Sequence, residues 1–312
     1  MLNNIFKDIK NNYPNSLVKN NIKIDIINDV PYNFLLENFD SKYVFPKIIT
    51  YIKNCKKYII ITYNNIRFHI FYIKNNDIII RHLIKSIMRA YTLTKINNYS
   101  HITFNIYILM SHYKRFIPKK GIINTKHING GFTSLTDDLN RQIFISRKEE
   151  YSKVILHEII HHFKHINNEN WDNFNITKLK KHFKISSMTK LNPNEAFVEL
   201  WATIYHILLI SYEYKINYKI LLKKEINNSL SQSYKLLEFN KNKYWKEKTN
   251  SYCYIIFKTI LLYNFNKLIK IYAFPYDISL MTNFLIKYSK LPLKNISHKK
   301  NNSLRMMILS DH

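Results

Sequence analysis

The chain has 312 residues, enough to bury one large core or two moderate ones without disulfide staples. Its formal net charge is +27, and a charge of this sign and size attracts polyanions. The composition is also rich in Lys, Asn, Ile and Tyr and holds only 3 Gly, which is the bias of an A+T-rich coding sequence. Arg is scarce beside Lys, and bidentate base recognition prefers Arg, so sequence-specific DNA binding is not expected as the main role and nucleic acid stays a secondary partner.

The two cysteines, Cys55 and Cys253, are too few for a disulfide framework or a cysteine-based zinc site and suit a reducing compartment, although one bridge between them stays open. The first 15 residues lack an apolar core of signal-peptide length. The most apolar later stretch, Tyr254 to Tyr263, is shorter than the roughly 20 residues that span a bilayer. We therefore expect a soluble, intracellular protein in the cytoplasm, with no membrane partner.

The first half of the chain alternates β-rich runs with one helical pattern, after a weakly patterned region over residues 1–50. Asn64-Asn65 is a good turn pair between two runs of β-branched and aromatic residues, which predicts a hairpin. Asp77 is placed to cap a helix that ends near Leu93. The expected strands are Lys57–Tyr63, Arg67–Ile73, His101–Met110 and Gln142–Ser146.

Two of the three glycines stand side by side in the run His127–Ser134. In a chain so poor in glycine, an adjacent pair indicates backbone positions where a side chain would not fit. One explanation is a tight turn or a bulge. The other is a sheet edge at which an extended peptide substrate adds as a further strand, with Asn129, Gly130 and Gly131 as substrate-binding residues.

The segment Val154–Phe163 reads VILHEIIHHF and predicts a buried helix. Glu149 and Glu150 precede it and are expected in its first turn, where they would complement the helix dipole. His157 and His161 are four residues apart, so on a helix they project from one face and can bind one metal ion.

Glu158 follows the first of these histidines, where its carboxylate can reach a water on the metal rather than the metal itself. Zinc would lower the pKa of that water and polarise a scissile carbonyl while Glu158 takes the proton. This His-Glu-x-x-His motif is expected by chance about 0.02 times in a chain of this composition. The alternative is a core helix whose histidines are satisfied by hydrogen bonds.

A catalytic zinc usually has three protein ligands, so one more is needed. Asn192-Pro193 predicts the start of a second helix that runs through Tyr212, and Glu195 in its first turn is the best third ligand. Glu199, one turn further, is placed to accept a hydrogen bond from a histidine ligand and fix its tautomer. Glu195 would otherwise complete a capping box with Asn192.

Other histidines compete for the third position. His182 stays open as a ligand. His165 continues the line of His157 and His161 along the helix and does not easily converge on the same ion. His162 points to another face, either at the surface or behind the ligands. Residue 167 is Asn where the metzincin pattern has its third histidine, which excludes that pattern.

The two motifs together resemble the gluzincin zinc metallopeptidases, the group that includes thermolysin and the zinc aminopeptidases. Asn194-Glu195 matches the Asn-Glu pair whose glutamate binds zinc in that group, and Glu199 matches the acidic residue four positions later that supports a histidine. The resemblance covers about residues 127–206, and with the A+T-like composition the chain is also similar to zinc proteases of large DNA viruses, which would place it in the host-cell cytoplasm. The implied site has one zinc ion with ligands His157, His161 and Glu195, general base Glu158, and Glu199 behind the ligands.

The sequence departs from that group in two respects. The gap from His161 to Glu195 is longer, which implies an inserted Asn- and Lys-rich loop at about residues 166–190. The aminopeptidase signature Gly-x-Met-Glu-Asn, which grips a substrate amine, is absent upstream, and this argues against an aminopeptidase. An oxyanion-stabilising residue is also expected, and the candidates are Tyr205, His206 and the tyrosines near Tyr272.

The order of the elements predicts an α+β fold: a zincin-like domain with a twisted mixed sheet and an active-site helix, followed by a helical C-terminal half with breaks at Pro275 and Pro292. The expected regions are 1–50, a catalytic core over 51–220, and a helical region over 221–312. The predicted function is zinc-dependent hydrolysis of peptide bonds in a peptide or protein substrate. The alternative is a non-catalytic basic protein that binds nucleic acid or another partner and retains the zinc helix.

Overall fold

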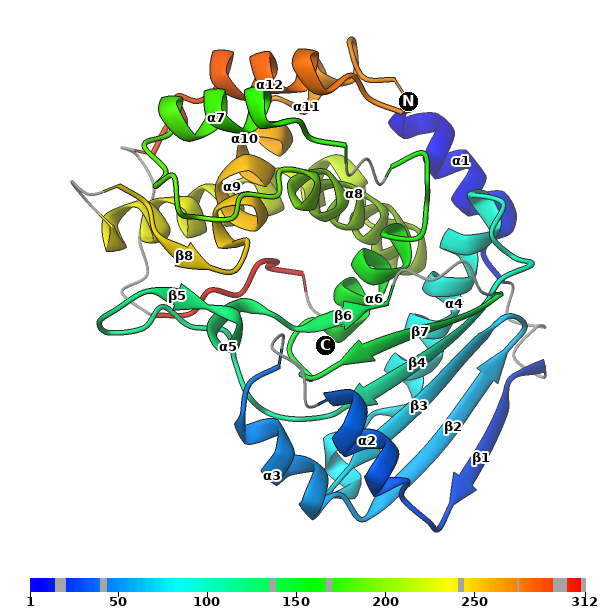
Figure 1. Ribbon diagram of the computed structural model, residues 1–312. Helices are drawn as coiled ribbons and strands as arrows, with labels where there is room; N and C mark the ends of the chain where they lie inside the picture. Colours follow the sequence, from blue (N-terminus) through cyan, green and yellow to red (C-terminus); the bar gives the residue numbers. More distant parts are fainter. Residues whose placement is uncertain are drawn as a thin grey trace.

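The computed structural model describes residues 1–14, 21–39, 44–134, 139–166, 170–240, 244–273, 275–293 and 302–309. The fold is of the α+β class, as predicted, and is built on a mixed six-stranded sheet of order β1-β2-β3-β4-β7-β6 (Figure 1). The strands are β1 (Lys23–Ile27), β2 (Lys57–Tyr63), β3 (Ile66–Tyr72), β4 (Thr103–Leu109), β6 (Gly131–Thr133) and β7 (Asn140–Ile145).

The predicted hairpin is confirmed: β2 and β3 pair antiparallel. Asn64 in the turn has a φ of 50°, a left-handed conformation that Asn tolerates better than most residues. β3, β4 and β7 then run parallel, and β6 pairs antiparallel with β7. The short strand β6 therefore forms one edge of the sheet.

Helices cover both faces of the sheet (Figure 1). Successive side chains on a strand point to opposite faces, so Ile70 of β3 joins one core and Phe71 joins the other. The first core lies under α4 (Ile80–Ile96) and α6 (Tyr151–Ile160), and the second under α2 (Tyr32–Phe39) and α3 (Lys47–Asn54). Because both faces are covered, six of the seven residues of β3 are buried.

The second half of the chain is mainly helical, and α8 (Asn194–Tyr214) packs along α6. One hydrophobic core contains buried residues from nearly the whole chain, from Ile9 near the start to Met306 near the end. The region boundaries predicted at residues 50 and 220 stay predictions. Pro275 and Pro292 lie outside helices, as expected. The other elements are α1 (Leu2–Asn12), a 3₁₀ turn (Asn75–Asp77), β5 (Ile123–Asn124), α5 (Thr125–Ile128), α7 (Asn173–His182), α9 (Tyr218–Phe239), β8 (Glu247–Lys248), a π-helical turn (Tyr252–Phe257), α10 (Lys258–Tyr263), α11 (Phe265–Leu268) and α12 (Ile278–Lys287).

Two predictions about helix starts are wrong. Asp77 does not cap α4, because its Oδ2 accepts a hydrogen bond from the backbone N–H of Lys74 at 2.8 Å within its own 3₁₀ turn. Glu149 and Glu150 do not lie in the first turn of α6, which begins at Tyr151. Glu150 has a φ of 61°, outside the helical region.

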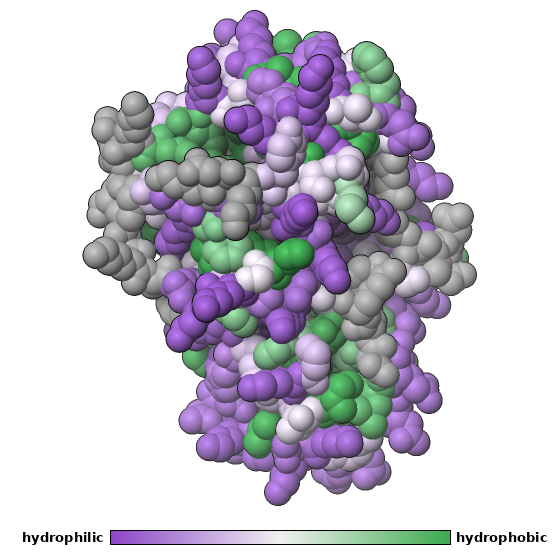
Figure 2. Space-filling view, turned by 60° about the vertical axis from the view of Figure 1, so that its left-hand side comes forward, coloured by the Kyte–Doolittle hydropathy of each residue, from purple (hydrophilic) through white to green (hydrophobic). Residues whose placement is uncertain are grey.

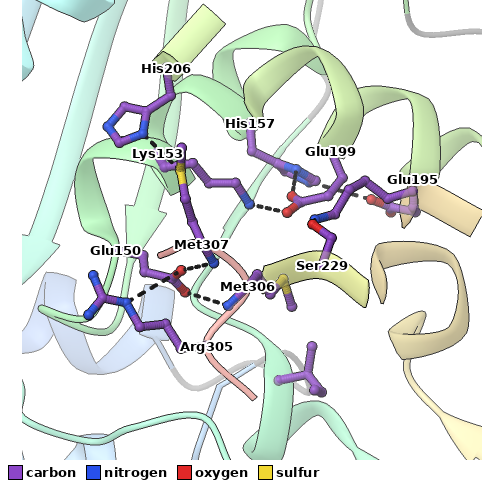
Figure 3. A network of polar contacts seen from close by, with 12 residues as sticks. Glu150, Lys153, His157, Glu195, Glu199, His206, Ser229, Arg305, Met306 and Met307 are labelled. Carbon is purple, nitrogen blue, oxygen red and sulfur yellow. Dashed lines mark hydrogen bonds and ion pairs between the residues drawn. The ribbon is translucent and has the colours of Figure 1, made fainter. Parts of the chain in front are cut away.

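The carboxylate of Glu150 serves a different purpose from the predicted one. It accepts hydrogen bonds from the backbone N–H groups of Met306 at 3.2 Å and Met307 at 2.5 Å (Figure 3). It also forms an ion pair with Arg115. These contacts join the start of α6 to residues 302–309, a segment that is far away in the sequence.

The structure also bears on the predicted insertion, on the two cysteines and on the possibility of a membrane-spanning helix. The insertion predicted as a loop at residues 166–190 contains the helix α7, although residues 167–169 lie outside the described residues. Cys55 and Cys253 are both buried and free, so they do not form a bridge. None of the described helices has the length and apolar character needed to cross a membrane.

Candidate metal centre

The two motif histidines project from the C-terminal end of α6. All ten residues of this helix are buried, because it lies between the sheet and α8. His161 follows the last helical residue with φ −55° and ψ −26°, so it continues the helical path and keeps the one-turn spacing. The Nε2 atoms of His157 and His161 face each other at 3.1 Å.

Glu195, in the first turn of α8, completes a three-donor cluster with these histidines. Its Oε2 lies 3.5 Å from Nε2 of His157 and 3.4 Å from Nε2 of His161. Tetrahedral zinc with bonds of about 2.0–2.1 Å separates its ligand atoms by roughly 3.3 Å. The three separations therefore fit one zinc ion, and two imidazoles with one carboxylate are a donor set that zinc favours.

Two details of Glu195 favour a ligand role over a helix-capping role. Its Oε2 is buried and makes no well-formed hydrogen bond among the described residues, and its neighbours at 3.4 and 3.5 Å are the two imidazole nitrogens. The start of α8 has no side-chain capping hydrogen bond, so the capping box with Asn192 is not formed. A cation held between this oxygen and the two imidazoles would satisfy it.

The carboxylates of Glu195 and Glu199 make the surroundings of His157 favourable for positive charge. Burial opposes charge on His157, but Glu195 and Glu199 raise its pKa to about 9. Burial also opposes charge on Glu195, yet the two histidines hold the pKa of its carboxyl well below the usual range. The place where the three donor atoms meet is therefore one that stabilises a cation.

Glu199 lies one turn after Glu195 on α8 and contacts His157 on the side of the ring away from the cluster, as its spacing in the sequence predicts. Its Oε2 accepts a hydrogen bond from Nδ1 of His157 at 2.9 Å, which leaves Nε2 of that ring facing the cluster (Figure 3). Lys153, one turn before His157 on α6, pairs with the other oxygen of Glu199 (Figure 3). Burial would raise the pKa of Glu199, but Lys153 and His157 lower it to about 2, so the carboxylate stays ionised.

Glu158 and the cluster open onto a cleft with a volume of about 870 Å³. Glu158 is only 6% exposed, and burial raises the pKa of its carboxyl. The structure thus brings the residues predicted for catalysis, metal binding and substrate binding to one place. Those that line this cleft are Asn129, Gly131, His157, Glu158, His161 and Glu195, whereas Gly130 lines an adjoining small pocket with Glu158.

The glycine pair lies where β6 approaches α6, and no side chain fits at either position. A Cβ on Gly131 would lie 2.9 Å from Val154 Cγ1 and 3.0 Å from the carbonyl oxygen of Phe144, and one on Gly130 would collide with the guanidinium of Arg115. Neither glycine has a positive φ, so a tight turn is not the reason for the pair. Gly131 begins the edge strand β6, whereas the substrate-binding role of the pair stays a prediction.

Tyr254 is a site residue that the sequence did not single out. It lies in the π-helical turn, lines the cleft, and places its ring centroid 5.8 Å from that of His157. Burial and the nearby Glu195 carboxylate raise its pKa well above the usual value, so its hydroxyl stays a hydrogen-bond donor. No local sequence pattern around Tyr254 marks it as a site residue.

The oxyanion candidates named from the sequence lie elsewhere. The hydroxyl of Tyr205 contacts Asn97, and that of Tyr272 accepts a hydrogen bond from Trp201. His206 lies two turns beyond Glu199 on α8 and contacts Met307. None of the three lines the cleft.

The rival histidines also lie away from the three donor atoms. His182 is exposed on α7, with Nε2 3.0 Å from Ser289 Oγ, so it is not the third ligand. His165 contacts Asn97. His162 is buried rather than at the surface, and its Nε2 lies 2.8 Å from Thr133 Oγ1 on β6.

No family model, no curated protein and no solved structure matches this chain. The interpretation of the site therefore depends on its own geometry and on the resemblance of its two motifs.

Proposed function

We propose that the protein is a zinc-dependent metallopeptidase that hydrolyses peptide bonds, with a gluzincin-type site on a zincin-like domain. The observation that carries the proposal is the position of Glu158 beside three donor atoms spaced for one zinc ion, at the wall of an open cleft. His157, His161 and Glu195 would hold the ion. When bound, zinc would supply a water of lowered pKa and polarise the scissile carbonyl.

The chain's own side chains account for the remaining steps. Glu158 accepts the proton of the attacking water, because burial raises its pKa and favours its protonated form, and it then passes that proton to the leaving amine. Glu199 and Lys153 hold the imidazole of His157 in the tautomer that binds metal. The hydroxyl of Tyr254 donates a hydrogen bond to the oxygen on which charge develops.

The edge strand supports a peptide as the substrate. The backbone N–H of Ser146 donates to the carbonyl of Gly130 at 2.9 Å, so Gly130 faces β7. Hydrogen-bonding alternates along an antiparallel pair, and the backbone groups of Gly131 and Thr133 therefore point away from β7 into the cleft. An extended peptide would add there as a further antiparallel strand.

The open cleft also bears on the non-catalytic alternative. A structural zinc site is closed by four protein ligands, whereas a catalytic site keeps one position for water. Only three metal-ligating side chains converge in the described part of the chain, and Glu158 lies beside them. The buried free thiols support an intracellular location as part of the proposal.

The test compares the zinc-loaded protein with its Glu158→Gln variant on a mixture of unstructured peptides, with cleavage followed by mass spectrometry. The proposal expects cleavage by the wild type, loss of cleavage with chelator, and retained zinc but no cleavage in the variant. Cleavage at the wild-type rate by Glu158→Gln would overturn the mechanism. A wild type that binds zinc and cleaves no peptide would favour the non-catalytic alternative.

A further inference from the structure

Three lysines line the cleft at places remote from each other in the sequence. Lys126 lies on α5, Lys248 on β8, and Lys190 precedes α8. β5 and β8 pair in parallel, with Asn124 opposite Lys248, so Lys126 and Lys248 belong to one wall. Lys190 lies two residues before Asn192, which also lines the cleft.

The carboxylates of the cleft do not neutralise these lysines. Glu158 and Glu195 belong to the proposed catalytic set. Glu247 is turned into the protein, where it accepts hydrogen bonds from the hydroxyl of Ser251 and the backbone N–H of Tyr252, and burial raises its pKa to about 7. Among the described residues, no carboxylate lies within 4 Å of the ammonium group of Lys126, Lys190 or Lys248.

The face of the molecule in Figure 2 is mainly hydrophilic, and its hydrophobic residues form small separate patches. Three lysine side chains line the cleft itself, so charge is a means by which the cleft can select its substrate. The same cleft contains the outward backbone groups of Gly131 and Thr133, which suit a peptide more than a nucleic acid.

We infer that the substrates are acidic peptides, in which Asp or Glu side chains flanking the scissile bond pair with Lys126, Lys190 and Lys248. This inference rests on the proposed peptidase function. Each half-exposed pair contributes modestly, so the three together give roughly a ten-fold preference at low salt. The preference shrinks in 1 M salt, where charges are screened beyond about 3 Å.

The experiment uses two labelled peptides that differ only in Glu or Gln at the positions flanking the cleaved bond. With zinc-loaded wild type, kcat/KM is expected to be about ten-fold higher for the Glu peptide. The variant Lys126→Gln/Lys190→Gln/Lys248→Gln removes this difference. The matched control is Lys219→Gln/Lys223→Gln/Lys224→Gln on the exposed face of α9. It removes the same amount of charge and is expected to retain the difference in kcat/KM between the two peptides.

Equal kcat/KM for the two peptides would overturn the inference, as would a preference that survives in the cleft variant or is lost equally in the control. If no peptide is cleaved, the proposed function fails by itself, and fluorescence anisotropy of the same two peptides still decides the substrate class. Tighter binding of the Glu peptide that depends on the cleft lysines upholds the inference. If the protein binds single-stranded DNA through the cleft lysines and binds the two peptides equally, the inference is overturned and the cleft is a nucleic-acid site.

Discussion

Glu199 accepts a hydrogen bond from Nδ1 of His157 at 2.9 Å, and this contact directs the opposite nitrogen of the ring toward Glu195 and His161. The carboxylate is buried, so its charge depends on the ammonium group of Lys153. The proposed metal ligand His157 on α6 is thereby oriented by a pair of residues that joins α6 to α8.

Replacing Glu199 by Gln is expected to weaken zinc binding by about 10- to 100-fold, because the neutral amide no longer favours the donor tautomer of His157. The zinc dissociation constant is measured by competition with a chromogenic chelator. Tyr214→Phe, at an exposed position near the end of α8, is the control and keeps the wild-type constant. An unchanged constant in Glu199→Gln would show that the contact does not orient the ligand.

Lys153→Met is expected to lower the free energy of unfolding by about 3–5 kcal/mol, because it leaves the Glu199 carboxylate buried without this partner. Adding Glu199→Gln to that variant removes the unpaired charge and should restore much of the stability. It should not restore zinc affinity. Urea unfolding of the two single variants and the double variant measures the coupling, and simple additivity would contradict a direct Lys153–Glu199 interaction.

Tyr254→Phe is expected to reduce kcat by about 100-fold with little change in KM, because the hydroxyl acts on charge that develops after binding. Steady-state hydrolysis of a cleaved peptide gives both constants. Tyr263→Phe, at a half-exposed position on α10, serves as the control. A kcat within two-fold of the wild type would remove Tyr254 from the mechanism.

His69 on β3 makes stability depend on pH away from the candidate metal centre. It is buried, its Nδ1 lies 2.6 Å from the hydroxyl of Tyr58, and burial lowers its pKa to about 4. The unfolded chain, in which a histidine titrates near pH 6.5, binds more protons than the folded chain between pH 6.5 and 4. The stability is therefore complete above pH 6.5 and falls as the pH drops through this window.

The contribution of His69 to this loss is up to about 3 kcal/mol by pH 4. In His69→Phe, the free energy of unfolding should fall less steeply between pH 6.5 and 4. Urea unfolding in the presence of chelator measures the slope, with His101→Phe at an exposed position as the control. Parallel slopes for wild type and His69→Phe would contradict a buried neutral histidine.

The sequence predicted those parts of the fold that depend on local pattern. The strands β2, β3, β4 and β7 follow from runs of β-branched and aromatic residues, α4 and α6 from their apolar patterns, and α8 from the start signal Asn192-Pro193. The meeting of Glu195 with His157 and His161 was predicted from paired motifs, because the residue types at those spacings are the ones a zinc site needs.

The residues that were missed depend on tertiary packing. Tyr254 reaches His157 only because the π-helical turn packs on α8, and nothing near Tyr254 in the sequence marks that approach. Glu150 was expected to serve the helix dipole, but its partners Met306 and Met307 come from a remote segment. Local rules fail at such positions because the competing partner is distant in the chain.

The most direct test of the account is an anomalous-scattering map from crystals of the zinc-loaded protein. The account predicts one zinc ion at about 2.0–2.2 Å from Nε2 of His157, Nε2 of His161 and a carboxylate oxygen of Glu195, with a fourth position open to the cleft beside Glu158. Zinc held by four protein side chains, or zinc bound at another place while these three donors stay vacant, would contradict it.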